Sequence, residues 1–342
     1  MRAEDTQMFQ EAASAGAVVR SQLARNAPLM AELGERLRGL SPTVALLSGR
    51  GSSDNAGVYA RYLIETGTGT PTSPAALSSS SVYDVQPRLR GAVCIAISQS
   101  GQSPDLVASV AAARAGGAFV IALVNAEGSR LAEVADVTVP LLAGRETSVA
   151  ATKSFIASLS ALAQLIGHWS ADAGQLRALD ALPGQLDDAF QRDWSPALDT
   201  LVQAQSLYVV GRGPGFAVAR EAALKLKETC GLHAEAFSGA EVRHGPQALL
   251  GASFPALVLG QDDAARGGLE ALAADLLARG VPVACAGARA AGAIELPTID
   301  SEPALAPLLL AQSFYRLANA VAIARGHDPD DPPHLSKVTE TH

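Results

Sequence analysis

The chain contains few aromatic residues and no cluster of positive charge. Aromatic side chains make up 4% of its 342 residues while 48% of the chain is hydrophobic, so small aliphatic side chains must do most of the packing. Lys and Arg number 26 against 34 Asp and Glu, which gives a formal net charge of −8. Proteins that bind nucleic acid or anionic membranes normally carry a basic patch. We therefore expect neither partner, and any bound phosphate must be held by local groups.

Cysteine is also scarce, and the three residues present are widely spaced at Cys94, Cys230 and Cys285. No CxxC pair occurs, so the pattern indicates neither a disulfide framework nor a zinc site. Free cysteines are among the most buried residue types in proteins. We expect three buried structural thiols, and neither a metal nor a redox cofactor.

Long apolar segments are missing as well. No uncharged apolar run approaches the roughly 18 residues that a membrane-spanning helix needs. The N-terminal sequence MRAEDTQMFQEAASAG is polar and acidic, and it lacks the apolar core of a secretory signal. These features predict a soluble, cytoplasmic protein.

The sequence contains an internal duplication, and its length fits two domains of roughly 150 residues. The segment TVALLSGRGSSDNAGVYARYLIE (43–65) has the same plan as SLYVVGRGPGFAVAREAALKLKE (206–228). Each copy has an apolar run, the tripeptide GRG, a turn of small or polar residues and an Ala-rich helix. A continuously apolar run is typical of a strand buried on both faces of a parallel sheet. Each copy therefore predicts a strand, a turn and a helix in succession.

Apolar runs and helical stretches alternate in both halves, and this predicts two doubly wound parallel sheets of the α/β class. The expected strands lie at 43–48, 92–97, 118–123 and 136–140, and again at 206–210, 254–259, 281–285 and 293–296. The expected helices lie at 103–115, 149–169, 215–230, 264–279 and 303–325. Residues 172–200 favour helix, broken at Pro183 and Pro196, and link the two halves.

The turn Ser98-Gln99-Ser100-Gly101-Gln102-Ser103, called the serine loop below, is the best candidate for a phosphate site. It joins an apolar strand to a helix, and ligands of parallel sheets bind beyond the carboxyl ends of strands, where free backbone N–H groups bind anions. The alternative is that Ser103 only caps the helix and the other serines are turn residues. A second hydroxyl-rich turn, Gly51 to Asn55, follows the first strand and should face the same crevice.

A third turn, TSVAATK (Thr147 to Lys153), enters the helix at 149–169. Lys153 could reach a phosphate, but from its position alone a solvated helix lysine is the favoured interpretation.

One helix carries a candidate acid–base group. Glu221, Lys225 and Glu228 fall on one face of the helix 215–230, in a narrow charged stripe that excludes Lys227. Such a stripe either lines a pocket or forms a surface ion pair, and the helix alone leaves both open. His244 precedes a Gly-Pro turn signal, so it should lie on a loop, where a histidine can carry protons near neutral pH.

Together these motifs resemble the isomerase half of glutamine:fructose-6-phosphate aminotransferase, a family built from paired SIS (sugar isomerase) domains. The resemblance rests on ISQSGQSPD, LKLKETCGLHAEAFSGAEVRHGP and PPHLSKVTE, and it spans nearly the whole chain. It implies two tandem SIS domains, each a parallel five-stranded flavodoxin-like sheet flanked by helices. The implied segments are a helical arm (1–32), SIS domain 1 (33–175), a helical linker (176–195), SIS domain 2 (196–327) and a C-terminal tail that closes the site (328–342).

The resemblance also implies the substrate contacts. The residues that match the family's sugar-phosphate ligands are Ser53, Ser98, Gln99, Ser100 and Ser103, the last standing where a threonine is usual. Val149 matches a backbone contact to the sugar. Ala151 matches a further substrate-binding position, where a serine is frequent.

The resemblance assigns catalytic roles to four residues. Glu228 matches a glutamate that moves the proton between C1 and C2, and Lys225 matches a lysine that assists it. His244 matches a histidine that opens the sugar ring and comes from the neighbouring subunit, which implies a homodimer. Lys337 matches a tail lysine that closes over the sugar and can form an imine with the ketose.

The chain departs from the aminotransferase at its start, where residue 2 is Arg2 rather than the catalytic cysteine of a glutaminase. The tail HLSKVTETH looks more like that of stand-alone glucosamine-6-phosphate deaminases. The expected reaction is therefore glucosamine 6-phosphate and water to fructose 6-phosphate and ammonia. A fructosamine-6-phosphate deglycase, a galactosamine-6-phosphate deaminase, a tagatose-phosphate isomerase and a sugar-phosphate sensor without activity stay open as alternatives.

Overall fold

The structure is a computed structural model that describes residues 2–337. The chain forms two compact units, and each contains one sheet. Of the described residues, the first-sheet unit contains 17–146, 153–180 and 336–337, and the second-sheet unit contains 2–16, 147–152 and 181–335. Each is described by itself below.

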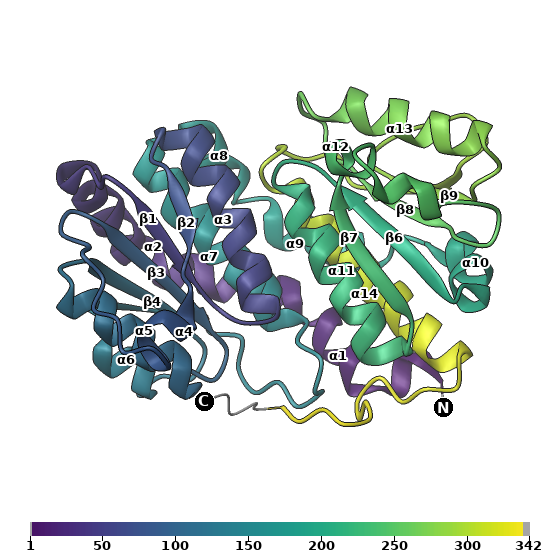
Figure 1. Ribbon diagram of the computed structural model, residues 1–342. Coiled ribbons are helices and arrows are strands. Elements are labelled where there is room, and N and C mark those ends of the chain that lie inside the picture. The colour runs from purple at the N-terminus through teal and green to yellow at the C-terminus, as the bar shows by residue number, and fades with distance from the viewer. Residues whose placement is uncertain (1, 338–342) are drawn as a thin grey trace. The chain divides into compact units, whose positions relative to one another are not determined.

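The first-sheet unit holds five parallel strands in the order β2-β1-β3-β4-β5 (Figure 1). Their bounds are Ala45–Ser48 (β1), Thr72–Pro74 (β2), Val93–Ser98 (β3), Phe119–Val124 (β4) and Val137–Pro140 (β5). Its helices are Ala15–Leu40 (α2), Ser52–Thr68 (α3), Leu77–Ser81 (α4), Pro104–Ala115 (α5), Arg130–Val134 (α6), Lys153–Ser170 (α7) and Ala173–Ala178 (α8). All six residues of β3 are buried, as expected of a strand covered on both faces.

Helices cover both faces of this sheet. Alternate residues of β3, such as Cys94 and Ala96, pack on Leu106 and Val110 of α5. Helices α3 and α7 pack on each other, and α3 contacts β1 and β3. Helix α2 is fastened by Gln22, whose Nε2 donates to the carbonyls of residues 141 and 157 at 2.8 and 2.9 Å.

The second-sheet unit repeats this plan, with five parallel strands in the order β10-β9-β8-β6-β7. The strands are Ser206–Gly211 (β6), His233–Ser238 (β7), Ala256–Leu259 (β8), Val283–Ala286 (β9) and Ile294–Leu296 (β10). The helices are Gln7–Ala13 (α1), Leu182–Phe190 (α9), Leu198–Gln203 (α10), Gly215–Cys230 (α11), Gly239–Val242 (α12), Arg266–Ala278 (α13) and Ala306–Ala324 (α14), with short 3₁₀ turns at Ala3–Asp5, Ser195–Ala197 and Pro246–Leu249.

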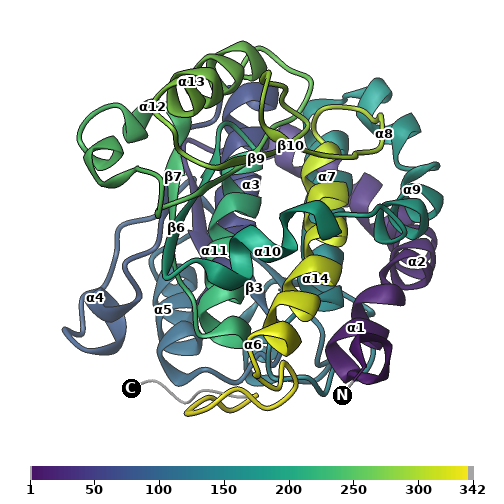
Figure 2. The same ribbon diagram turned by 90° about the vertical axis from the view of Figure 1, so that its right-hand side faces the viewer.

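The two faces of the second sheet are again covered by helices. Tyr208 and Val258 pack on Leu269 and Leu272 of α13. Helices α11 and α14 lie side by side, as Figure 1 and Figure 2 both show, and α11 also contacts β6 and β7. This pairing places the buried face of α11 against α14.

The predicted α/β fold with two parallel five-stranded sheets is confirmed. The eight strands expected from apolar runs form within about two residues of their predicted bounds. The runs did not identify the edge strands β2 and β7, because β2 has three residues and most of β7 is not buried. The linking segment is broken just before Pro183, as predicted: α8 ends at Ala178, and Pro183 lies in the first turn of α9, where a proline is tolerated.

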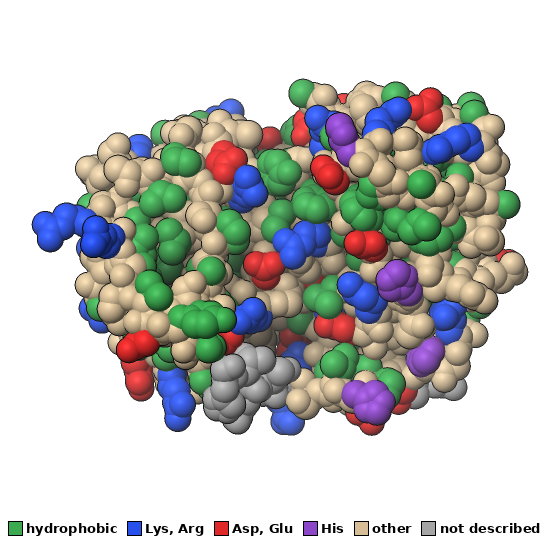
Figure 3. All heavy atoms as spheres, viewed as in Figure 1, with side chains coloured by type: hydrophobic (Ala, Val, Ile, Leu, Met, Phe, Trp, Pro, Cys, Tyr) green, Lys and Arg blue, Asp and Glu red, His purple; other side chains and the backbone are tan. Residues whose placement is uncertain are grey.

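The surface carries charges of both signs. On the face shown in Figure 3, Lys and Arg side chains are interspersed with Asp and Glu, and apolar side chains lie scattered between them. Among the described residues, no helix is long and apolar enough to cross a membrane.

The three cysteines are buried and free, as predicted. Burial raises the pKa of the Cys94, Cys230 and Cys285 thiols to about 11. A thiol ionises with a pKa of ~8.5 in an unfolded chain, so the folded state should lose stability as the pH rises from there towards 11.

We therefore expect the native protein to be inert to an aromatic disulfide reagent at pH 8, with all three thiols reacting once denaturant unfolds it. Release of the coloured thiolate, followed by absorbance with and without denaturant, measures this. Rapid reaction of even one thiol in the native protein would contradict the burial of that residue.

Candidate active site

The serine loop begins at the carboxyl end of β3 and leads into α5. Ser98 Oγ accepts a hydrogen bond from the Gly101 amide at 2.9 Å, and Ser100 Oγ accepts one from the Gln102 amide at 3.3 Å. Gly101 has a φ of +61°, and an added Cβ would lie 2.1 Å from Ser129 Oγ. The tight turn therefore requires glycine. Its backbone brings serine hydroxyls to the N-terminus of α5, a position suited to an anion.

The hydroxyls of Ser103 and Ser53 are available for a ligand. Ser103 occupies the N-cap position of α5, but its side chain makes no capping hydrogen bond. Ser53 lies in the first turn of α3, which has no side-chain cap either. Within residues 2–337 neither hydroxyl has a hydrogen-bond partner. The alternative that Ser103 serves only as a cap is thus wrong.

An arginine fastens the two turns to each other. Strands β1 and β3 are parallel neighbours, with Ser48 opposite Ala96, so the turns that follow them leave the sheet at the same edge. Arg50, from the tripeptide GRG, donates from Nε and Nη2 to Asp105 Oδ2 at 2.9 and 2.5 Å. Asp105 lies in the first turn of α5 and its side chain is 3% exposed. This Arg50–Asp105 pair fixes the serine loop relative to the turn that carries Ser53.

Replacing Arg50 by alanine should weaken sugar-phosphate binding about tenfold, because the two turns lose their common anchor and a buried carboxylate loses its partner. Titration of the protein with glucosamine 6-phosphate, followed by calorimetry, measures the affinity. The matched control is Arg61→Ala, which removes an exposed pair with Glu65 on α3. Equal affinities for Arg50→Ala and Arg61→Ala would rule out a positioning role for Arg50.

The charged stripe of α11 forms a buried ion cluster. Lys225 is 1% exposed; its Nζ lies 3.5 Å from Glu221 Oε1 and donates a short hydrogen bond to Glu228 Oε2. Glu221 is 1% exposed and accepts a hydrogen bond from the Tyr315 hydroxyl of α14 at 3.3 Å. Glu228 is 23% exposed. The cluster is therefore no surface ion pair, and Glu228 is its carboxylate with access to solvent.

His244 lies in a turn after α12, as its Gly-Pro neighbourhood predicted. Its backbone amide donates to the Glu241 carbonyl at 2.9 Å, and its side chain is exposed. Within the described part of the chain its ring makes no hydrogen bond to the ion cluster. The imidazole is thus open to solvent or to a partner molecule.

The segment 147–152 belongs to the second-sheet unit and carries Val149 and Ala151. The Val149 amide donates to the Asp330 carbonyl at 3.4 Å, so a backbone contact to a sugar would use its carbonyl. Ala151 is half-buried. Lys153, at the start of α7, is 9% exposed and donates to the Arg145 carbonyl at 2.6 Å. The interpretation of Lys153 as a solvated lysine is therefore wrong, because its side chain is buried and its ammonium group donates to a backbone carbonyl of the turn before α7.

Lys337 in the C-terminal segment is paired with Glu146. Its Nζ lies 2.9 Å from Glu146 Oε2, and the Glu146 side chain is fully buried. Glu146 also accepts hydrogen bonds from the hydroxyl and the amide of Ser154, at 2.6 and 3.1 Å. The remainder of the predicted tail, residues 338–342, lies outside the described residues. The Glu146 carboxylate thus defines where the Lys337 amine lies in the first-sheet unit.

These arrangements match a known family. The family model described as "SIS domain" matches residues 44–167 and 200–288, which include the serine loop and the ion cluster of α11. The chain belongs to the SIS domain family. Its two SIS domains correspond to the two sheets.

Three of the known proteins that are similar to this SIS protein illustrate the relationship. The isomerising glutamine–fructose-6-phosphate aminotransferase of Aeropyrum pernix is 35% identical over 314 residues, a match that covers 86% of this chain and 50% of the relative. A Silicibacter pomeroyi protein, provisionally named a phosphosugar isomerase, has a crystal structure with a TM-score of 0.91 at 40% identity, covering 95% of this chain and 100% of that one. Glucosamine-6-phosphate deaminase from Thermotoga maritima gives a TM-score of 0.80 at 22% identity, covering 98% and 100%, which shows likeness of fold alone.

The chain spans about half the length of the curated relatives it matches, which are isomerising aminotransferases. The shared part is the SIS part of those enzymes. Membership therefore shows a phosphosugar-isomerase type of SIS protein, without identifying the reaction.

The structure divides the predicted site residues of this SIS protein between its two units. The first-sheet unit carries Ser53, Ser98, Gln99, Ser100, Ser103 and Lys337, and the second-sheet unit carries Val149, Ala151, Lys225, Glu228 and His244. Within the units, the structure brings together Lys225 with Glu228, and the serine loop with the turn of Ser53. Among the described residues there is no group of acidic, histidine or cysteine side chains that could hold a metal ion.

Sequence reasoning missed four supporting residues: Arg50, Asp105, Glu146 and Tyr315. Arg50 lies in the motif GRG, and Asp105 lies in the motif SPD. A buried carboxylate requires a cation as its partner, so these two motifs could have indicated the pair. Nothing in the spacing of Glu146 or Tyr315 reveals their partners, because each contact joins segments that are distant in sequence.

Proposed function

We propose that this SIS protein deaminates and isomerises an amino-sugar phosphate, converting glucosamine 6-phosphate and water to fructose 6-phosphate and ammonia. The observation that carries the proposal is the ion cluster of α11, in which a buried Lys225 holds the partly exposed carboxylate of Glu228. A fixed carboxylate with solvent access is suited to moving a proton on carbon. The serine loop supplies the complementary feature, a site for the phosphate.

Each residue has one chemical role in this proposal. The serine loop and Ser53 bind the phosphate, and His244 opens the pyranose ring. Glu228 takes the proton from C2 and returns it at C1, which converts the C2 amine of the open aldose to a C2 imine. Water then adds to the imine carbon, the C–N bond breaks, and ammonia leaves with the ketose. Lys225 holds the Glu228 carboxylate in place by a charge-assisted hydrogen bond.

The proposal includes a homodimer in the cytoplasm in which His244 acts in the site of the partner subunit. The exposed imidazole, which makes no hydrogen bond within residues 2–337, supports this arrangement. Lys337 is the candidate amine for closing over the sugar, and Glu146 holds it in place.

Replacing Glu228 by glutamine should lower turnover of glucosamine 6-phosphate about 10²- to 10⁴-fold, because the amide cannot accept the C2 proton. Ammonia and fructose 6-phosphate, measured together, should appear in equal amounts with the wild-type protein. Lys227→Gln, on the exposed face of the same helix, is the matched control and should keep full activity.

Mixtures of Glu228→Gln with His244→Ala test the shared site in the same assay. Reassociated subunits should recover about a quarter of the wild-type activity, because half of the dimers then contain one intact site. Binding of the sugar phosphate without either product would favour a sensor. Turnover of fructosamine, galactosamine or tagatose phosphates in its place would redirect the assignment to that substrate.

A further inference from the structure

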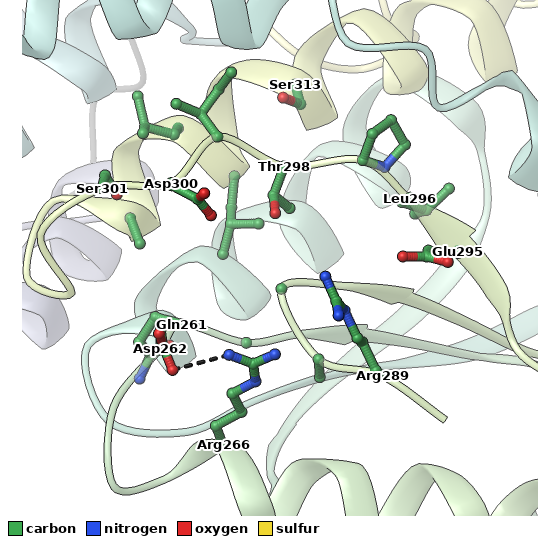
Figure 4. A pocket seen from close by; sticks show the side chains of 18 residues that line it. Gln261, Asp262, Arg266, Arg289, Glu295, Leu296, Thr298, Asp300, Ser301 and Ser313 are labelled. Atoms are coloured by element: carbon green, nitrogen blue, oxygen red, sulfur yellow. Dashed lines mark hydrogen bonds and ion pairs between the residues drawn. The ribbon is translucent and has the colours of Figure 1, made fainter. Parts of the chain in front are cut away.

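A cavity of about 470 Å³ opens in the second-sheet unit, where β8, β9 and β10 end and α14 begins (Figure 4). Its volume is in the range of small-molecule sites. It also lies beyond the carboxyl ends of parallel strands, the place where ligands bind such sheets. None of the residues given a role in the proposed reaction lines it.

The internal duplication explains why this cavity is open. In the first-sheet unit, Asn125 follows β4 and bridges the turn after β5: its Nδ2 donates to the Gly144 carbonyl and its Oδ1 accepts from the Ala143 amide, both at 2.8 Å. The counterpart after β9 is Gly287, with a φ of +71°. An added Cβ there would lie 2.0 Å from the Gly260 carbonyl oxygen. A bridging side chain is therefore barred, and the turns after β9 and β10 stay apart.

Two arginines form one wall of the cavity. Arg266 is held by Asp262 at 2.8 Å and by Glu270 at 3.0 Å. Glu270 also accepts a hydrogen bond from the Arg289 backbone amide at 3.2 Å, which ties both arginines to one carboxylate. Figure 4 shows the guanidinium groups of Arg266 and Arg289 directed into the cavity. The Arg289 guanidinium has no ion-pair partner among residues 2–337.

The opposite wall carries hydroxyl and carboxylate groups. Thr298, Asp300 and Ser301 come from the segment between β10 and α14 and face the arginines across the cavity (Figure 4). This segment is fastened by Trp194, whose Nε1 donates to the Pro297 carbonyl at 2.9 Å, and by Gln185, whose Nε2 donates to the Asp300 carbonyl at 3.2 Å. The wall is thus held in place before any ligand binds.

The turn after β8 is the counterpart of the serine loop, and it cannot bind phosphate in the same way. Asp263 Oδ1 accepts from the Ala265 amide at 2.8 Å, and Asp263 Oδ2 accepts from Gln261 Nε2 at 2.7 Å. A carboxylate already occupies the position where a dianion would meet the helix. Among the residues that line the cavity, Arg266 and Arg289 carry the positive charge that an anionic group would meet.

We propose that this cavity is a second small-molecule site, which binds a phosphorylated amino sugar. The phosphate binds between Arg289 and Arg266, and the ammonium and hydroxyl groups bind to Asp300, Thr298 and Ser301. In a zwitterionic ligand of this class, the phosphate matches the guanidinium of Arg289 and the ammonium group matches the carboxylate of Asp300. The choice of an amino sugar rests on the proposed function, whereas the existence of the site rests on the cavity alone.

Calorimetric titration with glucosamine 6-phosphate tests the proposal, carried out on Glu228→Gln so that no turnover disturbs the signal. We expect two sites per chain. Adding Arg289→Ala should abolish one site and leave the serine-loop site unchanged, and adding Ser98→Ala with Ser103→Ala should abolish the other. Arg279→Ala, an exposed arginine of the same unit outside the cavity, should keep both sites.

The ligand class is tested with the probes fructose 6-phosphate, glucosamine and inorganic phosphate. Asp300→Asn should remove the preference of the Arg289-dependent site for glucosamine 6-phosphate over fructose 6-phosphate. A single site per chain that is insensitive to Arg289→Ala would overturn the inference. If Glu228→Gln binds glucosamine 6-phosphate at the Arg289-dependent site alone, and the serine replacements change nothing, the result would instead count against the proposed function.

Discussion

The buried ammonium of Lys225 is the constraint on which the candidate site depends. Removing a charge of this kind from water costs several kcal/mol unless it is paired. Two carboxylates of the same helix supply the pairing, and Tyr315 from α14 in turn donates to one of them. The second carboxylate, Glu228, is held by this network and still reaches solvent. Burial thus distinguishes the two glutamates of one stripe, because Glu221 is enclosed whereas Glu228 reaches solvent.

The duplicated SIS fold places different chemistry at equivalent positions of its two sheets. After β3 the turn of serines leaves the Ser103 hydroxyl at the N-terminus of α5 without a capping hydrogen bond, whereas the turn of the same origin after β8 is occupied by the carboxylate of Asp263. After β4 the side chain of Asn125 closes a crevice that Gly287 leaves open after β9. One copy is therefore suited to bind a phosphate beside the strand, and the other retains a separate cavity.

Much of this architecture could be predicted from the sequence. Fully buried parallel strands appear in the sequence as short apolar runs. The repeated GRG segment showed where each of the two sheets begins. The edge strands β2 and β7 were not predicted, because strands with exposed residues do not form a continuous apolar run. The stripe of α11 was visible from its spacing, but its burial was not, since that depends on α14, which is distant in sequence. For the same reason the pairing of Glu146 with Lys337 appeared only in the folded chain.

The central claim is that Glu228, held by Lys225, carries the proton between C2 and C1. Its most direct test uses glucosamine 6-phosphate with deuterium at C2 and follows the label by NMR during a single turnover. The account predicts that part of the deuterium appears at C1 of fructose 6-phosphate with the wild-type protein. It also predicts that the label stays at C2 of the unreacted sugar with Glu228→Gln. Loss of the C2 label at the wild-type rate in Glu228→Gln would contradict the account.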